Sequence, residues 1–261
     1  MAFNTGPVEP VMLKPESRLK FRCHPGIECY TRCCSNIDIL LTPYDIIRLK
    51  NRLETTSEDF LKLYTRAEVD EKSNLPHVFL KMLDNEEKAC PFVTREGCTV
   101  YSDRPATCRY YPVGQATHRI EKDGETVNEE FYVLVREEHC LGFKEEKEWT
   151  IDAWRRDQEA DLYDEINRPW KDFLMRRGFP TAAQVDEKKQ ALFYMASYNI
   201  DRFRKFVFES RFLEVVELDP AMIDSLKSDE LELMKFGFEY LKFLFGMDNT
   251  IRVRQEALPK E

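Results

Sequence analysis

Eight cysteines are the residues of this 261-residue sequence whose type and spacing suit chemistry. Four of them fall within twelve residues, in the segment Cys23-His-Pro-Gly-Ile-Glu-Cys29-Tyr-Thr-Arg-Cys33-Cys34. Four more follow at Cys90, Cys98, Cys108 and Cys140, and none occurs in the last 121 residues. Thiolate is a soft ligand that suits zinc, iron–sulfur clusters and copper(I). The sequence therefore predicts a metal centre held by all eight of these cysteines.

The spacing of the cysteines indicates which of them can meet at one metal. Cys29 and Cys33 are four residues apart and would share a face if that segment is helical, whereas the adjacent Cys34 would serve a second metal atom or another iron. No pair has the C-x2-C spacing of ordinary zinc knuckles. The favoured ligands are Cys29, Cys33, Cys34, Cys90, Cys98 and Cys108, with Cys23 and Cys140 next.

Cationic side chains near the cysteines are candidates for the surroundings of such a centre. Four thiolates around Zn²⁺ or a [4Fe–4S]²⁺ core leave a formal charge of about −2, which favours cationic and N–H neighbours. Arg104 and Arg109 flank Cys108, and we expect both to contact the bound cofactor. Arg22 and Arg32 lie beside the first cysteines, where solvated surface charge is an equally good interpretation.

Two simpler roles compete with metal ligation. A lone cysteine such as Cys140 is often a small buried hydrophobe, and clustered cysteines in a secreted chain form disulfides. The first twenty residues contain no continuous apolar segment typical of a signal peptide, so a reducing, cytoplasmic environment is expected. His24 and His139 each adjoin a cysteine, and for both a hydrogen-bonding role is favoured over ligation.

The elements predicted around the cysteines indicate an α+β protein. Thr42-Pro43 predicts a helix start, because a threonine oxygen can cap the helix and proline suits its first turn. Further expected elements are short strands at 36–41, 77–83 and 98–101, a hairpin over 119–136 with its turn at 122–125, helices from Ser57, from Thr150 towards Trp170 and from Thr181, and a last helix from Asp229 to Gly246. The division expected is an N-terminal arm over 1–22, a small cysteine-rich metal-binding lobe with short strands and helices over 23–145, and a mainly helical C-terminal lobe over 146–261. Its many phenylalanines are interpreted most simply as core.

Composition and missing motifs exclude several classes of function. Hydrophobic content of 43% and charged content of 33% are typical of a globular protein, and a net charge of −9 argues against binding nucleic acid or an anionic membrane. No apolar run approaches the roughly 20 residues that span a bilayer. The absence of any G-x-G excludes the usual dinucleotide and phosphate-binding fingerprints.

The ordered set of motifs resembles a known family. It comprises Cys29-x3-Cys33-Cys34, Thr42-Pro43-x-Asp45-x2-Arg48-Leu49, Cys90-Pro-Phe, Cys98-x2-Tyr101 and Asp103-Arg104-Pro105-x2-Cys108-Arg109-x2-Pro112. Together these resemble the YkgJ family, also called CxxCxxCC, of zinc- or iron-chelating proteins, over about residues 20–145. The aromatic helical tail resembles longer bacterial members. The five residues between Cys23 and Cys29 depart from the family's tighter spacing. Flagellin lysine-N-methylases share the cysteine pattern, and the resemblance implies an iron–sulfur cluster there.

These observations lead to one favoured function and two alternatives. The favoured function is metal binding through the cysteines, with an iron–sulfur cluster preferred over zinc and with a redox or protein-modification role. The first alternative is an iron–sulfur-dependent enzyme like the protein-lysine methylases. The second is a zinc-stapled module whose helical tail docks a protein partner. The sequence identifies neither a substrate nor a partner, and it names no catalytic residue.

Overall fold

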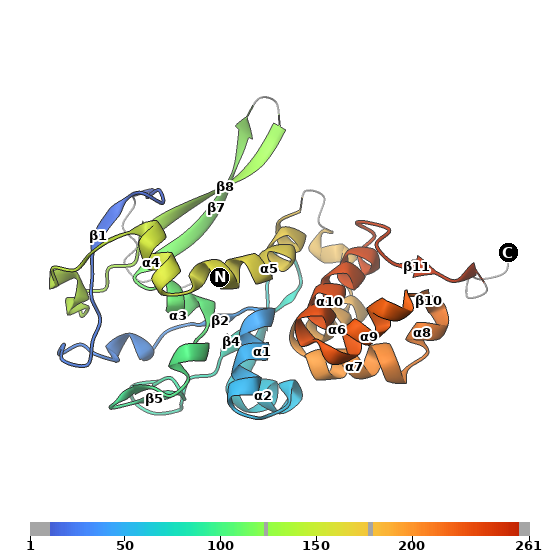
Figure 1. Ribbon diagram of the computed structural model, residues 1–261, viewed down its shortest axis with the longest axis horizontal. Coiled ribbons are helices and arrows are strands. Elements are labelled where there is room, and N and C mark those ends of the chain that lie inside the picture. Colours follow the sequence, from blue (N-terminus) through green and yellow to red (C-terminus); the bar gives the residue numbers. More distant parts are fainter. Residues whose placement is uncertain (1–10, 123–124, 177–179, 256–261) are drawn as a thin grey trace. The chain divides into compact units, whose positions relative to one another are not determined.

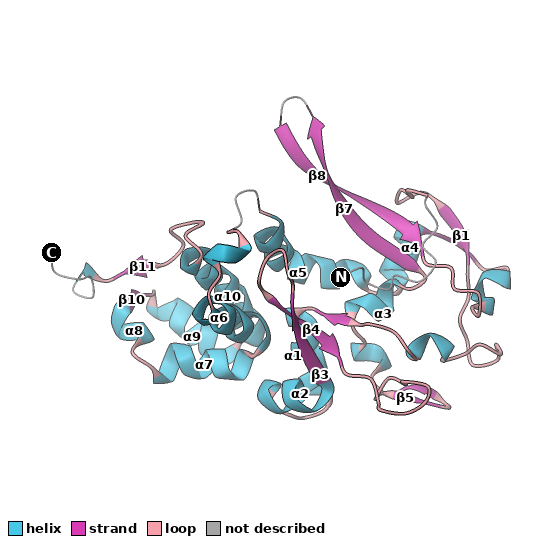
Figure 2. Ribbon diagram, turned by 180° about the vertical axis from the view of Figure 1, so that it is seen from behind, coloured by secondary structure: helices cyan, strands magenta, loops and turns pink. Residues whose placement is uncertain are grey.

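The computed structural model describes residues 11–122, 125–176 and 180–255 (Figures 1 and 2). The chain forms two compact units: the first unit is Met1–Leu40 with Leu80–Asp164, and the second unit is Leu41–Phe79 with Glu165–Glu261. Short strands in small sheets and a largely helical C-terminal half confirm the predicted α+β class. The boundaries at residues 22 and 145 stay a prediction.

The first unit contains all eight cysteines: Cys33, Cys34, Cys98 and Cys108 lie on short helices or strands, and the other four lie in turns and loops. In chain order the elements of this unit are β1 (Arg18–Lys20), η1 (Arg32–Cys34), β5 (Val93–Thr94), β6 (Gly97–Cys98), η2 (Tyr101–Asp103), α3 (Ala106–Tyr110), β7 (Val113–Lys122), β8 (Glu125–Leu134), η3 (Leu141–Lys144), β9 (Glu148–Thr150), α4 (Ile151–Asp157) and the start of α5 (Ala160–Met175). The strands pair antiparallel as β1 with β9, β5 with β6 and β7 with β8.

The core of the first unit is apolar and rich in aromatic rings. Strand β1 buries Leu19, and two residues further along the chain Phe21 is only 1% exposed. The ring of Phe21 packs edge-on against Trp154, with centroids 5.4 Å apart, and Trp154 packs in the same way against Trp149. The indole N–H of Trp149 donates to the Phe21 carbonyl at 2.9 Å. This cluster therefore anchors the chain just before the first cysteine.

The long hairpin of the first unit was predicted from the sequence, and the structure confirms it (Figure 1). Its register runs from Val113 opposite Leu134 to Lys122 opposite Glu125, so it begins earlier than expected. The residues at the tip of the predicted turn, 123–124, lie outside the described residues.

The second unit is mainly helical. Its elements are α1 (Pro43–Arg52), α2 (Ser57–Tyr64), β3 (Thr65–Val69), β4 (Pro76–Leu80), the rest of α5, η4 (Ala182–Gln184), α6 (Glu187–Tyr198), α7 (Ile200–Glu209), α8 (Phe212–Val215), β10 (Val216–Glu217), α9 (Pro220–Ser228), α10 (Glu230–Leu244) and β11 (Arg252–Val253). Strand β4 lies between β3 and β2 (Leu40–Leu41) in a three-stranded sheet, and β10 pairs with β11.

Helix starts were predicted most reliably, because capping depends on local sequence. Thr42 accepts a hydrogen bond from the Asp45 amide while the Asp45 carboxylate accepts from the Thr42 amide, so both orphan donors are satisfied. The last helix begins at Asp229 as expected, and Asp229 caps it. The helix expected from Thr181 is instead the short 3-10 helix η4, followed by α6, which Asp186 caps. The single helix expected from Thr150 towards Trp170 is instead two helices, because Glu159 adopts a left-handed φ of 56° between α4 and α5.

The strand predictions were less accurate at their ends. The strand expected over 36–41 is reduced to β2, and the one over 77–83 ends at Leu80. After β6 the chain turns into the 3-10 helix η2, since the Asp103 amide donates to the Val100 carbonyl at 2.8 Å. Residues 99–101 therefore do not continue the predicted strand.

The aromatic residues of the second unit form its core, as predicted. Phe203 and Phe238 are fully buried, and Phe236 is 5% exposed. Helices α6 and α10 approach closely at Gly237, where an added Cβ would lie 2.8 Å from the Ala196 carbonyl oxygen. A side chain at this position would force the two helices apart.

Among the described residues of the first unit, Arg109 is the charged residue with the smallest exposed fraction, 1%. Its guanidinium donates to the carbonyls of Arg104, Gln158 and Ser102, and it lies 4.2 Å from the centroid of the Tyr163 ring. An ion pair of 3.0 Å to Glu159 completes its surroundings. Arg109 therefore joins α3, which carries Cys108, to the link between α4 and α5.

We predict that Arg109→Met destabilises the protein by about 3 kcal/mol or more, because several buried carbonyls lose their donor. The free energy of unfolding from denaturant titration measures this effect. Arg156→Met is the matched control, since Arg156 is 63% exposed in its ion pair with Asp152; it should change stability by at most about 0.5 kcal/mol. Equal stabilities of the two variants would contradict the structural role of Arg109.

Candidate metal centre

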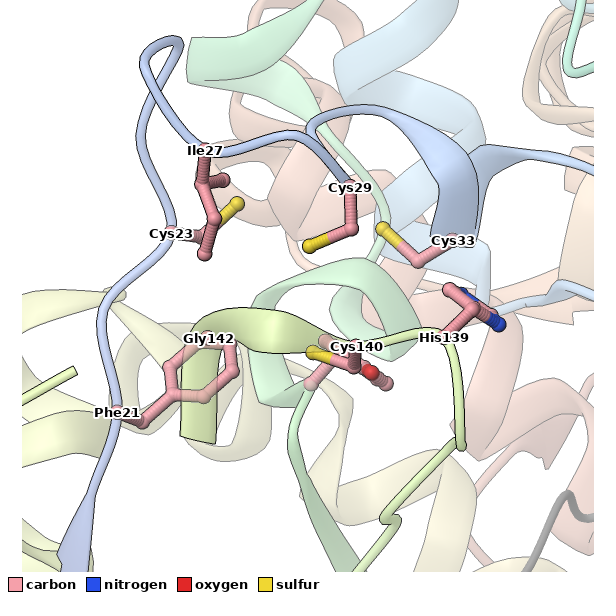
Figure 3. A pocket seen from close by; sticks show the side chains of 9 residues that line it. Phe21, Cys23, Ile27, Cys29, Cys33, His139, Cys140 and Gly142 are labelled. Atoms are coloured by element: carbon pink, nitrogen blue, oxygen red, sulfur yellow. The ribbon is translucent and has the colours of Figure 1, made fainter. Parts of the chain in front are cut away.

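All eight cysteines are free thiols, and four of them line one cavity of the first unit (Figure 3). The thiols come from two segments that are far apart in the sequence, and aromatic and aliphatic side chains complete the wall. The lining residues are Phe21, Cys23, Ile27, Cys29, Cys33, Tyr111, His139, Cys140 and Gly142. The cavity set is defined as Cys23, Cys29, Cys33 and Cys140.

The segment that carries the first cysteines is a succession of tight turns that ends in η1. Thr31 has φ of 69°, in the left-handed region, which a regular α-helix does not contain. Cys29 and Cys33 line the same cavity all the same (Figure 3). Turns rather than a helical face thus place these two thiols together.

Hydrogen-bond donors are directed at the sulfurs from the opposite wall. The amide of Leu141 donates to Cys29 Sγ at 3.2 Å, and the amide of Gly142 donates to the sulfur of Cys140. The Tyr111 hydroxyl lies beside the Cys140 sulfur and donates to the Glu137 carboxylate at 3.2 Å. Amide donors of this kind stabilise sulfur that carries negative charge, as a metal ligand does.

Close packing fixes the part of the cavity wall that contains Leu141 and Gly142. A Cβ added at Gly142 would lie 2.6 Å from the Phe21 ring, and the Arg22 amide donates to the Gly142 carbonyl at 3.1 Å. Glycine is required here because any side chain would displace Phe21 or the segment that carries Cys140. The sequence analysis did not identify Phe21, Ile27 and Gly142 as lining residues of the cavity. The available signal was the position of Gly142, two residues after Cys140.

Three thiols of the cavity set, Cys23, Cys33 and Cys140, have raised pKa values, although Cys23 is an exposed residue. Burial raises the pKa of Cys23 to about 11 and raises the pKa of Cys140. The pKa of Cys33 is raised first by a hydrogen bond with Cys34 and then by burial. A cysteine nucleophile needs a lowered pKa, so these thiols are unsuited to attack and become thiolates only when a cation balances the charge.

The two histidines next to cysteines have different positions. His24 Nδ1 accepts a hydrogen bond from the Gly26 amide at 3.2 Å, which agrees with the predicted hydrogen-bonding role. His139 lines the cavity, and its Nε2 lies 3.3 Å from the Glu137 carboxylate.

The other four predicted ligands, Cys34, Cys90, Cys98 and Cys108, do not line this cavity. Cys90 is buried and the other three are half-buried. Cys34 nevertheless adjoins the cavity set through its contact with the Cys33 thiol.

The predicted cofactor-binding arginines lie outside the cavity as well. Arg109 directs its hydrogen bonds at protein carbonyls, as described above, and Arg104 donates to the Tyr101 carbonyl at 2.6 Å. Their role in cofactor binding stays a prediction. Arg22 and Arg32 are exposed.

The donor chemistry of the cavity set fits a thiolate-bound metal, since four thiols and N–H donors meet in apolar surroundings. Two features of the structure show that the thiols must move before they can bind a metal. Among the described residues, no group of three or more His, Cys, Asp or Glu side chains is arranged to hold a single metal ion. The cavity is about 10 Å³, the room of about one water molecule. Either kind of centre therefore requires the thiols to adjust, inwards for a single ion and outwards for a cluster.

Comparison with known proteins agrees with this chemistry. No curated protein and no solved structure matches the chain. In the described part of the chain, no helix combines the length and the apolar composition needed to cross a membrane. A family model does match, over residues 22–141, which include every cysteine. The model is that of the CxxCxxCC family, whose description is "Putative zinc- or iron-chelating domain", so this segment is similar to that family.

Proposed function

We propose that the first unit binds an iron–sulfur cluster through the cavity set, and that the protein uses it in a redox or protein-modification role. The observation that carries this proposal is the arrangement of four thiols around one cavity instead of around one point. The irons of a cluster are spread over several positions, so each thiolate binds a different iron. A single zinc ion requires all its ligands about 2.3 Å from one centre.

The surroundings of the cavity set support the same centre. Phe21 and Ile27 contribute apolar side chains to the cavity wall, and the amides of Leu141 and Gly142 supply N–H donors to sulfur. When bound, a cluster would supply one-electron chemistry whose potential depends on such donors and on burial. The chain's own residues would hold the sulfurs and set the polarity around them.

A zinc ion at the same four thiols is the second candidate. The small volume of the cavity favours it, because a single ion needs less displacement of the wall than a cluster. The family description allows either metal.

The wider role of the protein is proposed from its composition. A net charge of −9 argues against nucleic acid or an anionic membrane as a partner, and the proposed setting is a cytoplasmic protein that acts on or with another protein. If the protein is an enzyme, we propose an activity like that of the protein-lysine methylases. A zinc-stapled module that docks a partner is its non-enzymatic form.

We predict that anaerobically purified protein is brown and contains iron and acid-labile sulfide, and that Cys29→Ser loses most of both. The loss follows because serine replaces a soft thiolate with a poor ligand for iron. Metal and sulfide analysis with a visible spectrum measures it. Ile27→Val is the matched control: it changes the same wall without altering a ligand and should retain the iron.

Colourless wild-type protein with zinc and without sulfide would reject the cluster and select the zinc candidate. Equal iron and sulfide in Cys29→Ser and the wild type would show that the cluster lies elsewhere.

We further predict that Tyr111→Phe shifts the reduction potential of the centre to more negative values. Loss of the hydroxyl removes a polar O–H group from the cavity wall beside Cys140, and polar groups near cluster sulfur stabilise the more negatively charged reduced state. A potentiometric titration followed by the visible spectrum measures the shift. Tyr101→Phe, at a residue 58% exposed, is the control and should leave the potential unchanged. An unchanged potential in Tyr111→Phe would mean that its hydroxyl does not act on the centre.

A further inference from the structure

Among the described residues, strand β3 of the second unit has an edge that no other strand covers. In the three-stranded sheet, β4 lies between β2 and β3, so β3 is an edge strand (Figure 2). In the described chain, no turn or loop makes a backbone hydrogen bond with Thr65–Val69. The strand also contains neither proline nor lysine, the residues that commonly protect such an edge. An open edge of this kind can accept a further strand.

The turn between β3 and β4 shows which backbone groups face this edge. The Asp70 amide donates to the Leu75 carbonyl at 3.0 Å, and the guanidinium of Arg66 lies 4.8 Å from the centroid of the Phe79 ring. Both observations match one antiparallel register, in which Asp70 opposes Leu75 and Arg66 opposes Phe79. The direction of the backbone groups alternates along a strand, and the Asp70 amide points at β4. The N–H and C=O groups of the odd-numbered residues of β3 therefore point away from β4.

The side chains along this edge are charged in the middle and apolar at the ends. Ala67 is exposed, and the side chains of Arg66 and Glu68 on either side of it are 36% and 41% exposed. Arg66 and Glu68 form an ion pair on one face of the strand. Val69 ends the strand at 45% exposure, and Leu63, two residues before the strand, is 61% exposed. The edge is thus open to a partner over its whole length.

The edge is complementary to itself. When two copies pair antiparallel with a two-fold axis at Ala67, Arg66 opposes Glu68 of the partner subunit, and Glu68 opposes Arg66 of the partner subunit. The outward N–H and C=O groups of Ala67 meet the same groups of the second copy. Val69 opposes Thr65 of the partner subunit, two residues from the partner's Leu63, so apolar side chains approach at both ends. A second copy therefore supplies both charges in the order that this edge requires.

The alternation of charge selects this register over its neighbours. Odd-numbered residues must oppose odd-numbered residues, because they direct their N–H and C=O groups outwards. A shift by two residues in one direction places Arg66 opposite Arg66 of the partner subunit, and a shift in the other direction places Glu68 opposite Glu68 of the partner subunit. Like charges directly opposed in this way are destabilising. Of the three registers, the one with its axis at Ala67 is the one that opposes unlike charges.

We propose that the protein forms a two-fold symmetric dimer through β3, which joins the sheets of two copies into one sheet of six strands. The strand order is β2-β4-β3 in one copy, continued by β3-β4-β2 in the other. The paired strands belong to the second unit, so the dimer does not depend on the metal centre proposed for the first unit. Because the paired segments are short, the dimer dissociates on dilution.

Sedimentation velocity over a dilution series tests the dimer, with a reductant present so that disulfide-linked chains do not contribute. At the highest concentrations the wild type should approach twice the 31.0 kDa mass of one chain. Ala67→Pro should keep the mass of one chain, because proline removes the amide donor at the two-fold axis. The fold should tolerate this proline, since the lost amide points away from β4. Ala67→Ser keeps the amide; it is the matched control and should dimerise like the wild type.

Charge reversal tests the partner and the register together. Arg66→Glu and Glu68→Arg should each have the mass of one chain, because every opposed pair then carries like charges. An equimolar mixture of these two variants should form a dimer, since each supplies the charges that the other lacks. The double variant Arg66→Glu/Glu68→Arg should also regain the dimer. Rescue in the mixture and in the double variant is specific to pairing between two copies at this edge.

A wild type with the mass of one chain at every concentration would overturn the proposal and leave this edge for a strand of another protein. A dimer of wild-type strength in Ala67→Pro, folded by circular dichroism, would place the interface elsewhere and overturn it as well. If Ala67→Pro fails to fold, the charge variants decide. Folded variants whose equimolar mixture does not dimerise would reject the pairing of Arg66 with Glu68. Failure of the metal proposal would leave these masses unchanged and would appear only in the metal and sulfide content.

Discussion

The contact between Phe21 and Gly142 is the constraint on which the cavity depends. Phe21 is fixed by aromatic packing against Trp154, and it leaves no space for a side chain at Gly142. This contact holds the segment that carries Cys140 against the segment that follows Phe21 and carries Cys23. The metal-binding geometry is therefore a product of the hydrophobic core, and the cysteines are attached to the edges of that core.

Burial of the thiols determines what chemistry they can perform. Apolar surroundings disfavour the charged thiolate, which is why burial raises the pKa of Cys23 and Cys140. At Cys140 the amide of Gly142 offsets part of this cost. A bound cation would offset the rest, so these two thiols suit either the neutral form or the metal-bound thiolate. That difference separates a ligand set from a catalytic cysteine, which needs a stable free thiolate.

The sequence pointed to the residue type that lines the cavity but did not show which cysteines line it together. The count and clustering of cysteines are local facts, and so is the capping box that begins α1. Cys23 and Cys140 were ranked last as ligands, yet both line the cavity, because their proximity results from packing between distant segments. Arg109 was singled out for its place beside Cys108, but its side chain enters a network of carbonyls instead. Neighbours in a helix point in different directions, so adjacency in sequence does not give adjacency to a site.

All eight cysteines lie in one unit although the chain leaves that unit between the fourth and the fifth of them. The chain leaves the first unit at Leu40 and returns at Leu80. The exit and the return are joined by the Leu80 amide, which donates to the Ile39 carbonyl at 2.9 Å, and by the bridge of Ser35 with Ala89. This backbone pairing returns the chain to the first unit before Cys90, so the later cysteines reach the unit of the earlier ones through the path of the chain and not through their spacing in the sequence.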